Sequence, residues 1–193
     1  MTSLVRTTGP TVRPLTVADI LPHLKIETDE DDSNLLGMLD AAIAEIDGKN
    51  GWLGRAIIQQ TWQYSLDSFC KRAIRLPLPP LVSVTSIKYY DTDGTLQTLS
   101  SSAYRVLTAP EPGIVEPIYG TEWPATRDMI DAVQILYVCG YTQGAVPPQI
   151  ITYLKNRVGT FDGSRDTLAP ISASEASWMK NMLEGLRVRA NYP

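Results

Sequence analysis

The sequence predicts an α+β protein: a helical, bundle-like domain interrupted by an inserted small antiparallel β-barrel or sandwich. Apolar residues recur at three- and four-residue spacing near both ends of the chain, which is the period of an amphipathic helix. Between residues 56 and 141 the period changes to two, which is typical of half-buried strands. Helices on both sides of a β-module bury their apolar faces by packing on each other. We therefore predict helical segments at 14–55 and 147–193 and a β-insertion at 56–146.

Two helices are predicted before the insertion. The first begins near Thr16, which can cap the free backbone N–H groups together with Asp19 at the third helical position. Pro22 indicates that this helix is short or bent. The second begins near Ser33, after acidic residues that favour the positive end of the helix dipole. Its apolar stripe comprises Leu35, Leu36, Leu39, Ala42, Ile43 and Ile46.

Six or seven strands are predicted in the insertion. The segment Asp91-Thr92-Asp93-Gly94 separates two of them and is a strong signal for a hairpin turn. Short strands at such regular spacing favour a barrel or sandwich. The predicted strands cover residues 57–66, 72–76, 82–90, 95–99, 104–106, 113–115 and 133–138.

Two further helices are predicted after Pro147-Pro148, because proline is well placed at a helix start. The first carries an apolar stripe from Ile150 to Val158, and a polar loop is expected from Gly159 to Pro170. The last helix is predicted from Ser174 to Arg189.

Composition excludes several classes of function. The chain has 193 residues, of which 44% are apolar and 20% charged, and no apolar run is long enough to span a membrane. The net charge is −4, and residues 1–50 carry four basic against nine acidic side chains. This is not the basic cluster that nucleic-acid binding needs. No signal peptide is recognisable, so we expect folding in the cytoplasm, with Cys70 and Cys139 as unpaired thiols.

No catalytic or metal-binding set is predicted. His23 is the single histidine, so a Ser-His-Asp or Cys-His arrangement or a zinc site has no basis. Glu116, Glu122 and Asp128 lie in loop-like stretches, as most surface carboxylates do. We expect no cofactor, no metal and no enzymatic activity.

A series of short motifs in the β-insertion resembles a known family. They are Gly54-Arg55-Ala56-Ile57-Ile58-Gln59-Gln60-Thr61-Trp62, Leu76 to Ile87 (LPLPPLVSVTSI), Tyr90 to Gly94, Ser102 to Val106, Trp123 to Arg127, and Gly140-Tyr141 followed by Val146-Pro147-Pro148. Together with the leading segment from Leu15, this succession is similar to the longer, β-inserted head–tail connector proteins of siphophages, prophages and gene transfer agents. The resemblance covers roughly residues 14–160.

The resemblance implies a structural protein of the virion neck. About twelve copies would form a head-to-tail ring beneath the portal protein and extend the DNA channel. A stopper or tail-completion protein would bind the far side, and assembly would take place in the host cytoplasm. DNA would pass through without sequence-specific binding, which an acidic surface favours by repelling it.

The C-terminal helix contains the residue types that protein interfaces favour, namely aromatic residues, methionine and arginine. The candidate portal- or neck-binding residues are Trp178, Met179, Lys180, Met182, Arg187 and Arg189. The alternative is that this stripe only packs on the other helices.

Two other functions remain open from the sequence. A tail or baseplate module would use the β-domain to recognise a protein or glycan, with Tyr89, Tyr119 and Trp123 exposed at a concave site. A cell-wall hydrolase would depend on Glu116 or Glu122.

Overall fold

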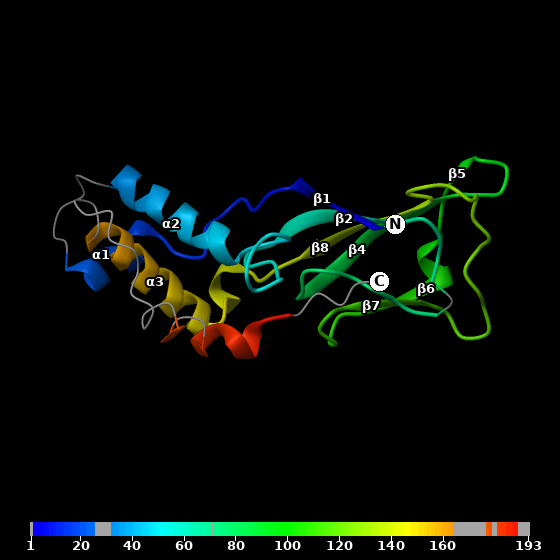
Figure 1. The fold of residues 1–193 in the computed structure, drawn as a ribbon. Helices are drawn as coiled ribbons and strands as arrows, with labels where there is room; N and C mark the ends of the chain where they lie inside the picture. The colour runs from blue at the N-terminus through cyan, green and yellow to red at the C-terminus, as the bar shows by residue number, and fades with distance from the viewer. Residues whose placement is uncertain (1, 26–31, 71, 164–176, 179–180, 189–193) are drawn as a thin grey trace. The chain divides into compact units, whose positions relative to one another are not determined.

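The computed structural model describes residues 2–25, 32–70, 72–163, 177–178 and 181–188. The chain divides into two compact units (Figure 1), each built from segments that are distant in the sequence. The helical unit contains Val12–Ile58 and Tyr141–Arg187, and the β-unit contains Gln59–Gly140 together with the N-terminal residues up to Thr11. The presence of both helices and antiparallel sheets confirms the predicted α+β class.

The helical unit begins with α1 (Val17–Leu24) and α2 (Asp32–Ile46). The backbone N–H and the hydroxyl of Thr16 both donate to the Asp19 carboxylate, at 2.8 and 2.6 Å. These bonds hold the pKa of Asp19 below its usual range. Pro22 lies inside α1, as predicted, and the helix is only eight residues long.

The buried positions of α2 follow the predicted stripe and meet α3 (Pro148–Gly163) and α1 in one apolar core. A short 3-10 turn, η2 (Gln143–Ala145), precedes α3. The fully buried members of this core include Ile20, Leu35, Leu39, Ala42, Leu53, Ile57, Ile150, Leu154 and Val158.

Helix α3 extends beyond the predicted boundary, so the prediction of a loop from Gly159 is wrong over its first five residues. Two contacts stabilise the helix beyond Gly159. The Thr160 hydroxyl donates to the Asn156 carbonyl at 3.0 Å, and Phe161 packs against the apolar core. Residues 164–170 of the predicted loop lie outside the described part of the chain.

The predicted last helix also ends earlier than expected. Ser177–Trp178 and Asn181–Leu183 are helical, and the 3-10 turn η3 (Glu184–Leu186) follows. Arg187 is extended, with φ −73° and ψ 127°, so it lies beyond the helix and not in its last turn as predicted. Gly185 weakens this final turn because glycine has low helix propensity.

The β-unit contains a five-stranded antiparallel sheet in the order β1-β2-β8-β4-β5. Its strands are β1 (Thr2–Thr8), β2 (Gln60–Leu66), β8 (Val133–Cys139), β4 (Leu81–Tyr90) and β5 (Leu96–Thr98). Central strand β8 alternates between buried and half-buried residues, with Val133, Ile135, Tyr137 and Cys139 inside. The predicted hairpin is confirmed, because β4 pairs with β5 across the Asp91–Gly94 turn.

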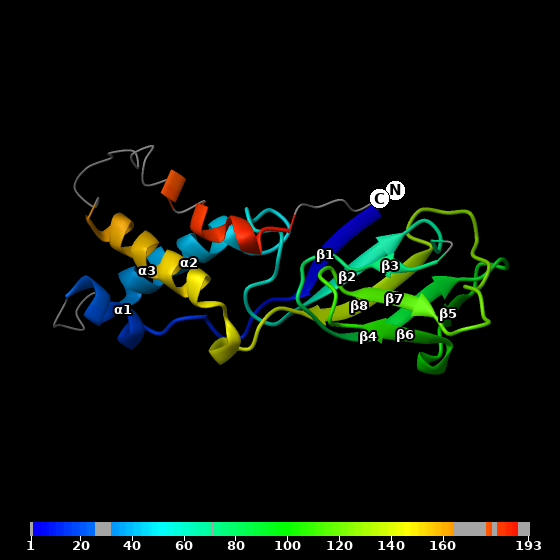
Figure 2. The same cartoon turned by 90° about the horizontal axis from the view of Figure 1, so that it is seen from below.

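A three-stranded sheet, in the order β3-β7-β6, lies over one face of the larger sheet (Figures 1 and 2). It consists of β3 (Ile74–Arg75), β7 (Ile114–Pro117) and β6 (Tyr104–Leu107), with the 3-10 turn η1 (Ser101–Ala103) before β6. The Tyr137 hydroxyl of the large sheet donates to the Pro77 carbonyl at 2.9 Å. Among the described residues the strands form two sheets and no closed barrel.

Two features of the β-unit differ from the sequence analysis. Strand β1 was not predicted, yet it pairs with β2 from Thr2 to Thr8 as an edge strand. Its residues are mostly exposed, so they show little of the alternation that identifies a half-buried strand. Strand β2 begins at Gln60 and not at Ile57, because Ile57 and Ile58 are buried in the helical core.

Candidate functional site

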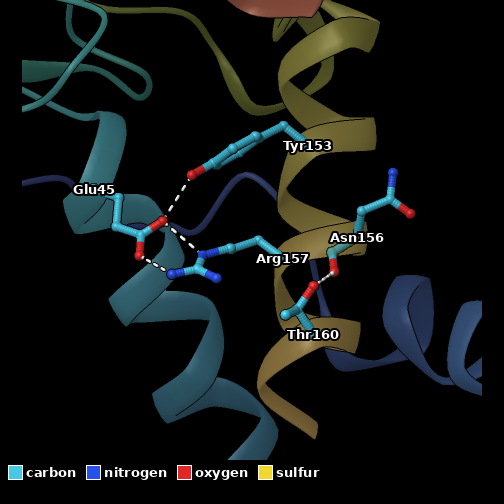
Figure 3. A network of polar contacts seen from close by, with 5 residues as sticks. All are labelled: Glu45, Tyr153, Asn156, Arg157 and Thr160. Carbon is cyan, nitrogen blue, oxygen red and sulfur yellow. Dashed lines mark hydrogen bonds and ion pairs between the residues drawn. The ribbon is translucent and has the colours of Figure 1, made fainter. Parts of the chain in front are cut away.

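A polar network joins α2 to α3 within the helical unit (Figure 3). The Tyr153 hydroxyl and the Arg157 Nε both donate to Glu45 Oε2, at 2.7 and 2.8 Å. The Arg157 Nη2 donates to the other carboxylate oxygen, so the guanidinium binds Glu45 in a bidentate manner. The guanidinium also lies over the Phe161 ring, 4.2 Å from its centroid.

This network shifts the pKa of each member. Burial acts to raise the pKa of Glu45, but the bonds from Arg157 and Tyr153 outweigh it, and the pKa of Glu45 is lowered. Burial and the neighbouring carboxylate raise the pKa of Tyr153. The bond to Glu45 raises the pKa of Arg157. The arginine is buried and both carboxylate oxygens of Glu45 accept hydrogen bonds from α3, so the network is a structural link between two helices.

The described members of the predicted partner-binding set differ in their exposure and contacts. Trp178 is 50% exposed, whereas Met182 packs against the apolar core that contains the fully buried Leu183. The Arg187 guanidinium lies over the Trp52 ring, 4.6 Å from its centroid, and its Nη1 is 3.9 Å from the Glu184 carboxylate. Met179, Lys180 and Arg189 lie outside the described residues.

The residue that anchors this C-terminal stretch, Arg55, was not among the predicted site residues. Arg55 is 4% exposed. Its Nε donates to the Leu186 carbonyl at 2.7 Å, and its Nη1 donates to the Tyr141 hydroxyl at 2.6 Å. In the sequence, the only signal for this role was a single arginine between a glycine and an apolar run. The sequence does not show which distant carbonyl the guanidinium binds.

A hollow of about 500 Å³ lies on the β-unit, beside the end of β2. Two aromatic rings stack in its lining, since the Phe69 and Trp123 centroids are 4.8 Å apart with an interplanar angle of 4°. The Trp123 indole N–H donates to the Arg72 carbonyl at 2.8 Å, so this ring is held in place. The other lining residues are Ser68, Cys70, Glu122, Pro124, Ala125 and Thr126.

The three aromatic residues of the alternative sequence interpretation occupy different positions. Trp123 lines the hollow, and Tyr89 touches the edge of Phe69 with centroids 5.7 Å apart. Tyr119 is fully exposed, on a turn in which the Thr121 N–H and hydroxyl both donate to the Ile118 carbonyl.

The two carboxylates of the hydrolase alternative, Glu116 and Glu122, lie in different environments. Glu116 forms an ion pair with Arg105 across the β6–β7 ladder. Glu122 is exposed at the rim of the hollow.

No group of three or more histidine, cysteine or acidic side chains could hold a metal ion in the part of the chain that is described. Neither Cys70 nor Cys139 forms a disulfide bond. Within the described ranges, no helix is long and apolar enough to cross a membrane.

No protein-family model and no curated protein sequence matches this chain. Solved structures do match. A chain of "Neck of empty GTA particle computed with C6 symmetry" superposes with a TM-score of 0.73 at 21% identity, covering 99% of this chain and 100% of that one. A chain of "Virion of native gene transfer agent (GTA) particle" gives 0.75 at 21% identity, with 98% and 99% covered.

A third chain, from "Neck of native GTA particle computed with C12 symmetry", gives a TM-score of 0.64 at 19% identity and covers 97% of this chain and 100% of that one. Each likeness extends over both units and leaves almost no residue of either chain unmatched. The protein therefore has the fold of a chain found in the neck and virion of gene transfer agent particles.

Proposed function

We propose that this protein is a structural head–tail connector subunit in the neck of a phage-like particle, and not an enzyme. The likeness over the full length to chains of gene transfer agent necks carries this proposal, because it includes the helical unit, the inserted sheets and the N-terminal strand together. A likeness confined to one unit would fit many unrelated functions.

In this role, about twelve copies form a head-to-tail ring beneath the portal protein and extend the DNA channel. Two of the neighbouring structures are necks with sixfold and twelvefold symmetry, which supports a cyclic arrangement. A stopper or tail-completion protein binds the opposite side of the ring. The acidic balance of the chain, with a net charge of −4, lets DNA pass without being held.

The C-terminal stretch is the proposed contact to portal or neck. Trp178 is half exposed and available, and Arg187 lies at the end of the helical stretch, stacked on Trp52. Met179, Lys180 and Arg189 complete the proposed set. Met182 supports this surface from below, because its side chain packs on the core.

The test is to express the full-length tagged chain in a host that is producing particles, and to purify both particles and free protein. The proposal expects the tagged chain in particles, co-purification of portal and neck proteins, and rings in class averages from electron microscopy. Recovery of baseplate, fibre or cell-wall components without portal protein would contradict it.

A second candidate is a binding module of a tail or baseplate. The hollow with stacked Phe69 and Trp123 favours it, because aromatic rings in a concave site are suited to a sugar ring or an apolar side chain. Trp123→Ala would then abolish binding to the host surface. A connector with the same change would still enter particles.

A further inference from the structure

The hollow on the β-unit is lined by two short segments, residues 68–70 and 122–126. Phe69 covers one face of the Trp123 ring, and both side chains are half-buried, so an occupant of the hollow meets aromatic surface. Aromatic faces bind cations as well as apolar groups, and tryptophan binds them best. The volume of about 500 Å³ is sufficient for a small ligand or a long side chain.

A carboxylate lies beside these rings and has no partner among the described residues. Glu122 directly precedes Trp123, is exposed and lines the hollow. The described lining residues include no lysine or arginine. Of the two neighbouring arginines, Arg127 lies with its Nη1 against Gly94, and Arg72 meets Trp123 through its backbone carbonyl. The hollow therefore carries a negative charge that no described lining residue balances.

Elsewhere the same chain places an arginine against both an aromatic ring and a glutamate. The Arg157 guanidinium lies 4.2 Å from the centroid of Phe161 and binds the Glu45 carboxylate (Figure 3). In the C-terminal stretch a second arginine lies 4.6 Å from the centroid of a tryptophan ring and 3.9 Å from a glutamate carboxylate, the three residues being Arg187, Trp52 and Glu184. In the hollow, rings and a glutamate also lie together, and only the arginine is missing.

We propose that the hollow binds an arginine side chain of a different protein in the particle neck; this rests on the proposed connector function. The planar guanidinium stacks on the aromatic rings, and the Glu122 carboxylate accepts hydrogen bonds from its N–H groups. The hydroxyls of Ser68 and Thr126, which also line the hollow, are further acceptors. Lysine fits less well, because its ammonium group is compact and cannot stack as a plane.

The arginine is assigned to a different protein because this chain has few to offer. Several of its described arginines already hold a carboxylate of the same chain, namely Arg13, Arg105, Arg157 and Arg187. Arg55 is buried and binds a carbonyl and a hydroxyl within its own unit. The net charge of −4 also favours a partner of opposite charge over a second copy.

A thiol placed in the hollow tests this contact. The tagged variant Ala125→Cys, combined with Cys70→Ser, is expressed in the particle-producing host; Ala125 is exposed and lines the hollow, and Cys139 is fully buried. Purified particles are treated with a short reagent that carries a maleimide for the thiol and a phenylglyoxal for arginine. The expected result is a conjugate of the tagged chain with one other protein, in which mass spectrometry of the peptides identifies the linked arginine.

Three matched variants show whether the hollow is responsible. Thr85→Cys, at an exposed threonine of β4 outside the hollow, should not link to the same arginine. Adding Glu122→Gln to Ala125→Cys should lower the yield of the conjugate by roughly tenfold, because a charge-assisted hydrogen bond is lost. Asp128→Asn removes an exposed carboxylate that follows the lining segment, and it should leave the yield unchanged. All these chains should still enter particles.

The opposite results are equally clear. An equal yield with Glu122→Gln would overturn the proposal, and so would a conjugate that joins two copies of this chain. Tagged Ala125→Cys chains that enter particles and never link to arginine would overturn it too, while the connector function would stand. Absence of the unmodified tagged chain from particles would instead remove the connector function and this inference with it.

Discussion

At the scale of single residues, the buried polar groups hold the helical unit together and give it a pH dependence. Glu45 binds both Tyr153 and Arg157, and its side chain is 37% exposed. Removing the carboxylate leaves a buried guanidinium without its charge partner, which costs more than the loss of one hydrogen bond. Because Glu45 is partly exposed, solvent screens its ion pair with Arg157 and reduces the free-energy cost of losing it.

The first prediction concerns Glu45→Gln. We expect a loss of about 1–2 kcal/mol in the free energy of unfolding at neutral pH, measured by urea denaturation. The folded-state pKa of Glu45 is lowered, so its contribution is complete above the unfolded carboxyl pKa of about 4.3. It is lost as the pH falls through the folded pKa. The difference between variant and wild type should therefore shrink in acid.

Tyr153→Phe is the matched control, because it removes one hydrogen bond and keeps the ion pair. We expect a loss of about 1 kcal/mol with little change in the acid dependence. A difference between Glu45→Gln and wild type that stays constant down to low pH would contradict the assigned role of Glu45.

The second prediction concerns Arg55, whose guanidinium binds the Leu186 carbonyl and the Tyr141 hydroxyl. Arg55→Met should cost about 2 kcal/mol and loosen the C-terminal stretch, because a buried charge-assisted bond is lost. Limited proteolysis after the exposed Glu184 should become faster.

Arg55→Lys keeps the charge but loses the planar fork, so it should be intermediate in both stability and proteolysis. Cleavage at the wild-type rate in both variants would show that Arg55 does not anchor this stretch.

At the scale of elements, the two sheets of the β-unit are tightly packed against each other at Gly113. A Cβ added to Gly113, just before β7, would lie 2.5 Å from the Leu81 side chain at the start of β4. The Gly113 carbonyl also accepts from the Leu76 N–H at 2.8 Å, so the backbone there cannot easily move away. This position is therefore a sensitive probe of the contact between the sheets.

The third prediction is that Gly113→Ala costs about 1–3 kcal/mol, because overpacking forces neighbouring atoms to shift. Gly37→Ala is the matched control, since Gly37 lies inside α2 and an added Cβ meets nothing within 4 Å. It should stabilise the protein by up to about 1 kcal/mol through higher helix propensity. The midpoints of thermal unfolding of both variants test this prediction. An unchanged midpoint for Gly113→Ala would show that the added Cβ is accommodated without cost.

At the scale of the whole molecule, the chain passes between its two units several times, so neither unit is a continuous segment. Strand β1 comes from the N-terminus, and the last helical stretch belongs to the same helical unit as α3. Exposed aromatic residues lie on both units, Tyr119 on the β-unit and Trp178 on the helical unit.

The fourth prediction separates assembly from stability. Trp178→Ala should leave the unfolding midpoint unchanged, because the side chain is 50% exposed. If it is an interface anchor, recovery of portal protein should fall by roughly 30-fold, or about 2 kcal/mol. Met182→Ala should instead lower stability by about 1–3 kcal/mol, because Met182 packs on the core.

Tyr119→Ala is the matched control for Trp178→Ala, since Tyr119 is an exposed aromatic residue on the β-unit. It should change neither stability nor portal recovery. Undiminished recovery with Trp178→Ala would remove this tryptophan from the proposed contact.

Much of the fold followed from the sequence because local periodicity reports local burial. The stripe of α2, the capping interaction of Thr16 and Asp19, and the Asp91–Gly94 hairpin depend on neighbouring residues, and each was confirmed. The seven strands after residue 56 alternate or end at turn residues, which is also local information.

Tertiary structure alone decided the features that depend on distant partners. Strand β1 is defined by its pairing with β2 and not by its own pattern, because an exposed edge needs no buried face. Arg55 is a structural anchor only because folding brings the Leu186 carbonyl to it. The sequence by itself determined which segments become helices and strands, since periodicity is a property of each segment. The tertiary structure decided which strands pair and which side chains are buried, since that depends on where every other segment packs.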